Sequence, residues 1–387
     1  MSFNYFVPSR ILFGRGKLNE LHEQELPGTK ALIVTSGGQS VKQFGYLARL
    51  EEQLKLASVD FVLFDKILAN PVIEHVMAGA ALAKAEGCDF VIGLGGGSSI
   101  DSAKSIAVMA TNPGDYWDYV SGGSGKGKPV PVRPLPIVAI TTTAGTGTEA
   151  DPWTVITNGR EKIGFGYDKT FPTLSVVDPE LMMSVPPRLT AFQGFDALFH
   201  STEGYVNVTA NEISDLFALK AIALIGKSLA AAVADGANQA ARDDVALANT
   251  FSGLVESTSG CTSEHSMEHA LSAYHPGLEH GAGLIMVSRA YYTFLAQSGS
   301  CSQRLIDMAK ALGKSDAKRP MDFVAALVEL QTQCGVADLK MSDYGIKPEE
   351  LQAMAQNARE TMGGLFAVDP CEITPADTLS ILEASYR

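Results

Sequence analysis

The fold is decided by the stretch Val91-Ile-Gly-Leu-Gly-Gly-Gly-Ser-Ser-Ile-Asp-Ser-Ala-Lys104. It begins as a short apolar run typical of a buried strand, passes through three consecutive glycines and continues with the pattern of a helix. A strand that enters a helix through a tight glycine turn is typical of a βαβ unit. The stretch therefore predicts a parallel sheet with helices packed against it.

The same alternation continues on both sides of this stretch. Short runs rich in β-branched residues predict strands at residues 31–35, 60–64, 88–94, 136–140 and 174–177. Helical patterns at residues 72–86 and 98–110 lie between them, and residues 121–134, rich in glycine and proline, predict a surface loop. We expect residues 1–183 to form an α/β domain that binds a dinucleotide.

After Pro186-Pro187, strand-like runs disappear and alanine- and leucine-rich patterns follow. These patterns predict helices at residues 214–234, 242–254, 301–312, 322–334 and 348–359. The chain has 387 residues, which at about 150 residues per domain agrees with two domains. We expect residues 184–387 to form an all-α, metal-binding domain.

Composition and charge narrow the possible partners. The chain is 46% hydrophobic and 19% charged, as in a soluble protein with a substantial core, and its net charge of −13 would repel nucleic acid and anionic membranes. No apolar run of about 18 residues stands out as a membrane span, and the first residues lack the order of a secretory signal. We therefore expect a cytoplasmic protein without nucleic-acid or membrane partners.

The five cysteines form no C-x-x-C pair. An odd number of cysteines without such a pair favours buried thiols in a reducing compartment over a disulfide framework or a zinc knuckle.

The glycine turn is the first candidate binding site. Gly95, Gly96 and Gly97 end a strand, and the helix after them offers unpaired N–H groups to a pyrophosphate. The alternative is a tight strand-to-helix turn without a ligand, and Ser98 stands where the third glycine of G-x-G-x-x-G would be.

A second run, Thr141-Thr-Thr-Ala-Gly-Thr-Gly-Thr-Glu149, also follows a strand. Its hydroxyls and backbone amides are suited to ribose, phosphate or a nicotinamide carboxamide, although alone it is a weak signal. Open α/β sheets bind ligands at the carboxyl ends of their strands, so the two runs together predict a nucleotide site.

The turn Thr35-Ser-Gly-Gly-Gln-Ser-Val-Lys42 bears on the choice of cofactor. An NAD-selective site usually directs a carboxylate at the ribose 2′-hydroxyl, and no Asp or Glu occurs between Thr29 and Glu51. The turn offers amides, a hydroxyl and a cation instead, which favours NADP(H) over NAD(H). The alternative is that these are ordinary turn residues.

Histidines crowd the second half of the chain. Asp196 and His200 are four residues apart, as are His265 and His269, so each pair shares one face of a helix. His280 follows after a break at Pro276-Gly277. One carboxylate and several imidazoles suit a divalent Fe, Zn, Co or Ni ion rather than Mg or Ca.

Other residues near these pairs are weaker candidates for the ion. His275 precedes a proline and is expected in a loop, although it or His269 would compete if the spacing shifted His280. Glu203 and Glu268 are able to ligate, but we expect them to support ligands or to be solvated.

Together, Gly95–Ser98, Thr142–Glu149, Gly194-Phe-Asp-Ala-Leu-Phe-His200 and the histidine cluster resemble the signatures of the iron-containing (group III) alcohol dehydrogenases over essentially the whole chain. The resemblance implies a Rossmann-like N-terminal domain, a helical C-terminal domain, an active site in the cleft between them and a homodimer.

The resemblance also implies roles for individual residues. The metal ligands would be Asp196, His200, His265 and His280, holding Fe²⁺ or another divalent transition metal such as Zn²⁺, with His269 close by. The cofactor contacts would be Gly37, Gly38, Gln39, Ser40, Asn70, Gly95, Gly96, Gly97, Ser98, Asp101, Thr142, Thr143, Thr146 and Lys162.

This chain departs from the family pattern in three places. Thr148 replaces a serine but keeps the hydroxyl, and the interval between His269 and His280 is one residue longer than usual. Ser36 stands where NAD-preferring members have Asp, which again favours NADP(H).

The expected activity is the reversible interconversion of a small neutral alcohol and its aldehyde or ketone by hydride transfer with NAD(P)(H). His269 would relay a proton or have a purely structural role. Glycerol dehydrogenases, maleylacetate reductases and dehydroquinate synthases share the layout and are the alternatives, because fold does not fix function. A non-catalytic nucleotide or metal sensor is a further alternative.

Overall fold

The computed structural model describes residues 2–387, which divide into two units. The α/β unit comprises Val7–Asn158 and Ile163–Ser184, and the helical unit comprises residues 2–6, Gly159–Lys162 and Val185–Arg387. Short pieces from the N-terminus and from around residue 160 thus join the helical unit, which sequence patterns did not indicate.

A six-stranded parallel sheet forms the centre of the α/β unit, as predicted. Its strands are β1 (Arg10–Phe13), β2 (Lys30–Ser36), β3 (Asp60–Ile67), β4 (Phe90–Gly95), β5 (Ile137–Thr141) and β8 (Leu174–Val177), in the order β1-β8-β5-β4-β2-β3. The four-residue edge strand β1 was not predicted, although β8, which is equally short, was.

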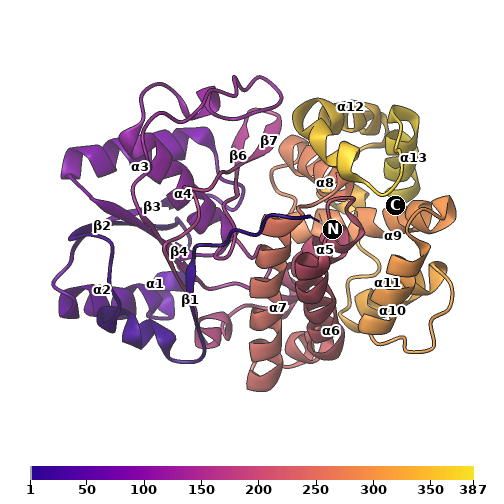
Figure 1. Ribbon diagram of the computed structural model, residues 1–387, viewed down its shortest axis with the longest axis horizontal. Helices are drawn as coiled ribbons and strands as arrows, with labels where there is room; N and C mark the ends of the chain where they lie inside the picture. The colour runs from indigo at the N-terminus through magenta and orange to yellow at the C-terminus, as the bar shows by residue number, and fades with distance from the viewer. Residues whose placement is uncertain (1) are drawn as a thin grey trace. The chain divides into compact units, whose positions relative to one another are not determined.

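Helices cover both faces of this sheet (Figure 1). They are α1 (Ser40–Gln43), α2 (Tyr46–Leu56), α3 (Ile73–Glu86) and α4 (Gly97–Thr111). Ile33 and Ile92 belong to the apolar cluster that includes α1 and α2. Gly93 lies on the opposite face, where a Cβ would come within 2.8 Å of the Ile100 Cα in α4. The two-residue period of the strands therefore buries both faces.

The strand order has a topological switch point between β2 and β4. From β2 the chain continues to its neighbour β3 on one side, and then returns to β4 on the other. The carboxyl ends of β2, β4 and β5 are therefore adjacent, and open α/β sheets bind ligands at such a point. The three turns that the sequence analysis selected follow these three strands.

The remaining elements of this half of the chain are short. Strands β6 (Thr154–Asn158) and β7 (Glu161–Phe165) form a two-stranded sheet that was not predicted, and residues 121–134 contain neither helix nor strand, as predicted. Three 3-10 segments complete it, namely η1 (Lys17–Glu23), η2 (Tyr116–Asp118) and η3 (Pro179–Met182).

Residues 185–387 contain helices and no strand, as predicted. The helices are α5 (Pro187–Val206), α6 (Glu212–Ala234), α7 (Gln239–Thr258), α8 (Ser263–Tyr274), α9 (His280–Ser298), α10 (Ser302–Ala311), α11 (Met321–Gln333), α12 (Leu351–Met362) and α13 (Pro375–Ser385). The 3-10 segments are η4 (Met341–Tyr344), η5 (Pro348–Glu350) and η6 (Gly363–Val368). The helix predicted from residue 348 begins at Leu351, because Pro348 starts a 3-10 turn.

Helix α6 is long and apolar enough to span a membrane by length and composition alone, contrary to our expectation. It packs against α5 and α7. The core helix of a helical unit has the same apolar composition, because it is buried on more than one side.

Candidate functional site

The four predicted metal ligands lie together in the helical unit. Asp196 and His200 come from α5, His265 from the first turn of α8, and His280 is the first residue of α9. The Asp196 Oδ1 lies 3.4 Å from His280 Nε2, 3.6 Å from His265 Nε2 and 3.8 Å from His200 Nε2. Three helices thus direct one carboxylate oxygen and three imidazole nitrogens towards a common point.

These separations fit a shared ion. Ligand atoms about 2.0–2.1 Å from a tetrahedral ion lie about 3.3–3.4 Å apart. Asp196 Oδ1 and His265 Nε2 are buried and have no hydrogen-bond partner among residues 2–387. Unsatisfied buried polar atoms are costly unless something binds them, so the donor set suits a divalent metal ion.

Two buried glutamates orient the imidazoles. Glu203 Oε1 contacts His265 Nδ1, and Glu268 Oε2 contacts His280 Nδ1. A carboxylate at Nδ1 selects the tautomer whose Nε2 lone pair is free for a metal. The structure therefore gives Glu203 and Glu268 a supporting position rather than one among the four donors.

Electrostatics also favour a cation here. Burial lowers the pKa of His200 to about 4, against the opposing charge of Asp196, so this imidazole is neutral at pH 7. Burial opposes ionisation of Asp196 and Glu268, but His200 and His280 hold the pKa of Asp196 well below its usual range, and His280 and Lys162 lower that of Glu268. Although burial opposes protonation, Cys261 and Glu203 raise the pKa of His265, and Glu268 raises that of His280. The buried carboxylates are therefore paired with protonated imidazoles, whose positive charge a metal ion would replace.

His280 forms the accessible side of the donor set. Its side chain is 24% exposed, against 4% for His265 and 6% for His200. Catalytic metal sites keep one position open for substrate, and the exposed edge at His280 is suited to that. The interval between His269 and His280 includes the loop between α8 and α9, and His280 still lies beside Asp196.

The other two histidines of the cluster lie outside the four-donor arrangement. His269 Nδ1 is 3.2 Å from the Lys162 carbonyl and 2.9 Å from the Met362 sulfur. His269 does fall into a group with Glu268 and His280 whose ligand atoms lie within 4.8 Å of one another. His275 follows the end of α8 and its Nε2 lies 3.3 Å from Glu350, as expected for a loop residue.

Lys162, expected to contact the cofactor, belongs to the helical unit. Its Nζ donates to Ser272 Oγ at 2.8 Å and lies 3.4 Å from both Glu268 Oε2 and His280 Nδ1. The structure thus places a buried ammonium group beside the predicted metal ligands.

In the α/β unit, the two glycine-rich turns pack directly against each other. A Cβ on Gly96 would come within 2.9 Å of Thr143 Oγ1, and one on Gly97 within 2.4 Å of Thr146 Cγ2. Gly95 has φ +149°, which L side chains rarely adopt. The glycines are therefore required for close approach of the two turns.

The remaining cofactor candidates near these turns are Asn70, Ser98 and Thr142. Thr142 N–H donates to the Gly95 carbonyl at 2.9 Å, which joins the turn after β5 to the turn after β4. Ser98 lies in the first turn of α4, and Asn70 in the loop after β3. Ser98 and Thr142 thus follow the carboxyl ends of the adjacent strands β4 and β5, whereas Asn70 follows β3, which β2 separates from β4.

A buried network that sequence reasoning missed supports the second turn. Lys104 Nζ donates to Thr148 Oγ1 at 2.6 Å and to Asp151 Oδ1 at 3.0 Å, and Thr148 Oγ1 donates to Asp101 Oδ1 at 2.7 Å. Asp101 Oδ2 accepts the Val155 N–H at 3.0 Å. The hydroxyl retained at Thr148 is thus used, and Asp101 has structural partners besides its expected cofactor contact.

The turn after β2 also has a partner that the sequence did not reveal. The residues from Gly37 to Ser40 are exposed, and Lys42 Nζ lies 2.5 Å from Asp65 Oδ2 in β3. This contact lowers the pKa of Asp65. A carboxylate therefore stands beside this turn, although none occurs in the turn itself.

Both halves of the chain match models of one protein family. Residues 8–179 match the family model "Iron-containing alcohol dehydrogenase", and residues 190–386 match "Fe-containing alcohol dehydrogenase family, C-terminal". "Alcohol dehydrogenase 4" of Schizosaccharomyces pombe is 34% identical, with 98% of this chain and 88% of the relative covered. "NAD-dependent methanol dehydrogenase" of Bacillus methanolicus is 33% identical, with 92% and 93% covered. A solved archaeal alcohol dehydrogenase from a Red Sea brine pool superposes with a TM-score of 0.95 at 33% identity, covering 100% of this chain and 99% of that one.

Proposed function

Because the chain belongs to the iron-containing alcohol dehydrogenase family and is thus an oxidoreductase, we propose that it interconverts a small neutral alcohol and its aldehyde or ketone. The reaction uses a nicotinamide dinucleotide, with NADP(H) preferred over NAD(H), and one divalent ion, Fe²⁺ or Zn²⁺. The convergence of four donor atoms from α5, α8 and α9 is the observation that carries this proposal.

Asp196, His200, His265 and His280 hold the ion, and the turns at Gly95–Ser98 and Thr142–Thr146 hold the dinucleotide. The chemistry that the bound groups supply is Lewis-acid polarisation of the carbonyl or hydroxyl oxygen, together with hydride transfer. Other features of the chain keep one imidazole neutral and turn the Nε2 atoms of two others towards the ion. Burial keeps His200 neutral, and Glu203 and Glu268 fix the Nδ1 side of His265 and His280.

The preference for NADP(H) rests on the turn after β2, which has no acidic residue and offers Lys42 to a 2′-phosphate. Asp65 opposes this preference, because its carboxylate pairs with Lys42 and would repel a phosphate. Relatives such as the Bacillus methanolicus enzyme are named as NAD-dependent. The activity test therefore compares NADPH with NADH.

The test measures oxidation of NADPH and NADH with butanal. The full chain is purified anaerobically, stripped by a chelator and reconstituted separately with Fe²⁺ and Zn²⁺. Asp196→Asn is the variant expected to abolish metal-dependent turnover, and His275→Ala is its matched control. Activity that vanishes on stripping and returns with metal supports the proposal. Cofactor binding without turnover by any reconstituted form would overturn it and favour a non-redox relative or a sensor.

We also propose that the enzyme is a cytoplasmic homodimer. All five cysteines are free thiols among residues 2–387, which supports a reducing compartment. Light scattering on the purified chain tests the subunit number, and cell fractionation tests the location.

A further inference from the structure

A chain of hydrogen bonds runs from the predicted metal ligand His265 to Asp369. Glu203 Oε1 contacts His265 Nδ1, and Glu203 Oε2 lies 2.9 Å from Thr262 Oγ1. Thr262 Oγ1 lies 2.7 Å from Tyr291 Oη, which lies 2.6 Å from Asp369 Oδ1. These contacts join α5, the residue before α8, α9 and the residue after η6. Three intervening side chains therefore connect Asp369 to the metal site.

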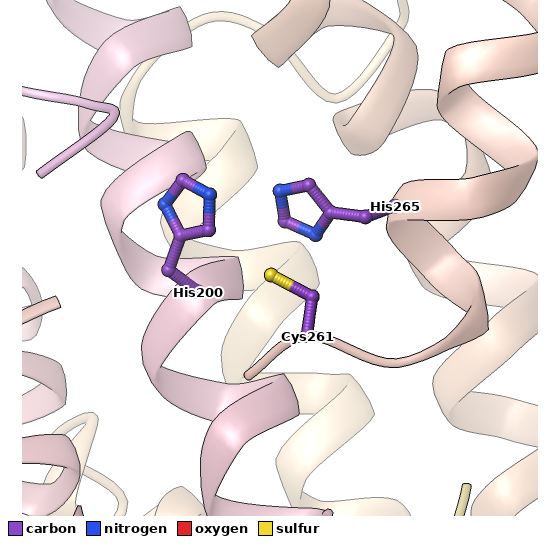
Figure 2. A group of neighbouring side chains, drawn as sticks. All are labelled: His200, Cys261 and His265. Carbon is purple, nitrogen blue, oxygen red and sulfur yellow. The ribbon is translucent and has the colours of Figure 1, made fainter. Parts of the chain in front are cut away.

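Thr262 belongs to the turn that leads into His265. The turn joins α7 to α8 and contains Cys261, and Figure 2 shows His265 pointing from the first turn of α8 towards His200 of α5. The centroids of the two imidazole rings lie 4.5 Å apart. Thr262 N–H donates to Glu203 Oε2 at 2.7 Å. A shift of Glu203 would therefore act on the start of α8 as well as on the orientation of His265.

The chain contains three contacts between oxygens, which need three protons, and its hydroxyls supply two. Thr262 and Tyr291 carry one hydroxyl proton each. Glu203 already accepts the Thr262 N–H and faces His265 Nδ1, so it is the acceptor at its end of the chain. The third proton therefore belongs to Asp369, whose carboxyl donates to Tyr291 Oη. Tyr291 then donates to Thr262, and Thr262 donates to Glu203.

The surroundings of Asp369 favour its protonated form. Its side chain is 5% exposed, and the other three members of the chain are fully buried, so bulk water does not supply the missing proton. Burial raises the pKa of Asp369 to about 7, and the charge of Glu203 acts in the same direction, whereas hydrogen bonds from Tyr291 and Ser263 oppose it.

The titratable groups that bear on Asp369 come from several elements. They are Glu203 of α5, Glu264 of α8, Tyr291 of α9, Cys301 before α10, and Cys371. Burial raises the pKa of Glu264 and of both thiols. No member of this set brings a positive charge that would compensate an ionised Asp369.

We propose that Asp369 holds the proton that completes this chain and thereby positions Glu203 and the metal ligand His265. The inference rests on the metal site of the proposed function and makes Asp369 a positioning residue. When Asp369 releases its proton to solvent, two protons remain for three contacts, so one pair of oxygens meets lone pair to lone pair. Either the Thr262–Glu203 or the Tyr291–Thr262 hydrogen bond is then lost, and His265 is held less firmly.

Infrared spectroscopy tests for the proton directly, because the C=O stretch of a protonated carboxyl is separate from the bands of a carboxylate. Spectra of the metal-free full chain are compared with those of Asp369→Asn at pH 6 and pH 8. We expect a protonated-carboxyl band at pH 6 that the variant lacks, and a smaller difference at pH 8. Other buried carboxyls, such as Asp151, contribute equally to both spectra. A band at pH 6 that is equal in the two proteins would overturn the proposal.

Zinc affinity tests the effect on the metal site. The chelator-stripped full chain and Asp369→Asn are titrated with Zn²⁺ against a chelating dye at pH 6 and pH 8. The amide of the variant offers Tyr291 a donor at either pH, so the two proteins should bind equally at pH 6. At pH 8 the wild type should bind about 2- to 10-fold more weakly than the variant, which is the effect of one lost hydrogen bond. The ratio of the two affinities removes the pH dependence that both share through their histidines.

Tyr291→Phe separates Asp369 from Thr262 and keeps the buried ring. In this background, Asp369→Asn should give the same affinity ratio at both pH values. The control background is Tyr386→Phe, whose hydroxyl donates to the Ile346 carbonyl at 3.3 Å, and there the ratio should change as in the wild type.

Two outcomes of the zinc titrations contradict the role of Asp369 and leave the metal site intact. One is an affinity ratio that is equal at pH 6 and pH 8 in the wild-type background, and the other is a change in the ratio that persists with Tyr291→Phe. Zinc binding with the expected ratios in a protein that oxidises no alcohol would instead contradict the proposed function and leave the role of Asp369 intact.

Discussion

Asp196 Oδ1 lies 3.4 Å from His280 Nε2, and this contact joins α5 to the first residue of α9. The next residue, Gly281, explains why the helices approach so closely. A Cβ at this position would stand 2.1 Å from the Phe192 carbonyl oxygen, which is backbone and unable to move aside. The spacing of the predicted metal donors therefore depends on Gly281, which has no side-chain donor of its own.

Gly281→Ala should weaken metal binding by displacing His280 from Asp196. We also expect a loss of stability of about 1–3 kcal/mol from overpacking. Metal content after dialysis and urea unfolding measure the two effects. Gly277→Ala is the matched control, since a Cβ there meets nothing within 4 Å. Full metal content in Gly281→Ala would show that the packing of α9 on α5 does not set the donor spacing.

Glu268→Gln should lower metal affinity by about 10- to 100-fold, because the amide orients His280 less firmly and removes a buried negative charge. Competition with a chelating dye measures the affinity. The control, Glu350→Gln, removes a partly exposed carboxylate that pairs with His275. Equal affinities in the two variants would argue against the supporting role of Glu268.

His269→Ala should reduce turnover more than metal content, because His269 Nδ1 contacts the Lys162 carbonyl and Met362 rather than the four-donor arrangement. Elemental analysis and kcat are measured on the same preparation, with His275→Ala as the control. Loss of the metal in His269→Ala would instead make His269 a ligand.

Lys42 and Asp65 should act oppositely on cofactor choice. Lys42→Ala removes a cation that a 2′-phosphate would contact. A hydrogen bond to a charged group contributes about 1.5–3 kcal/mol, so KM for NADPH should rise by about 10- to 150-fold, with little change in KM for NADH. Asp65→Asn removes the competing carboxylate and should lower KM for NADPH. If the ratio of KM for NADPH to KM for NADH is unchanged in both variants, this pair does not take part in cofactor selection.

Ionisation of Asp369 should lower the free energy of unfolding as the pH rises from about 4 to 7. Burial raises its pKa to about 7, and its Oδ1 accepts a hydrogen bond from Tyr291. The folded state then binds more protons than the unfolded state in this window, so ionisation favours unfolding. Asp369→Asn should remove about one proton from the pH dependence of the free energy of unfolding.

Urea unfolding at pH 4.5, 5.5 and 6.5 measures this slope. Asp316→Asn is the control, because the Asp316 side chain is 83% exposed. Parallel slopes for the wild type and Asp369→Asn would contradict the raised pKa of Asp369.

Local patterns in the sequence were sufficient for the fold class and for the metal ligand candidates. Strand and helix periods reflect burial that is repeated along each element, so β2 to β5 and the long helices were predictable. The i,i+4 spacing placed Asp196 with His200 and His265 with His269 for the same reason. The strands β1, β6 and β7 were not predicted; unlike β8, which is buried along its whole length, they are only partly buried.

Tertiary structure alone decided which side chains from different elements meet. The pairs Glu203–His265, Glu268–His280 and Lys42–Asp65 join separate helices or strands, and no spacing along the chain encodes them. Cys261 had no cysteine partner in sequence, and it faces His200 only because the turn before α8 packs on α5. Sequence by itself determined the elements and the types of donor, since these depend on local burial and spacing. The packing of distant elements determined which donors converge and which residues support them.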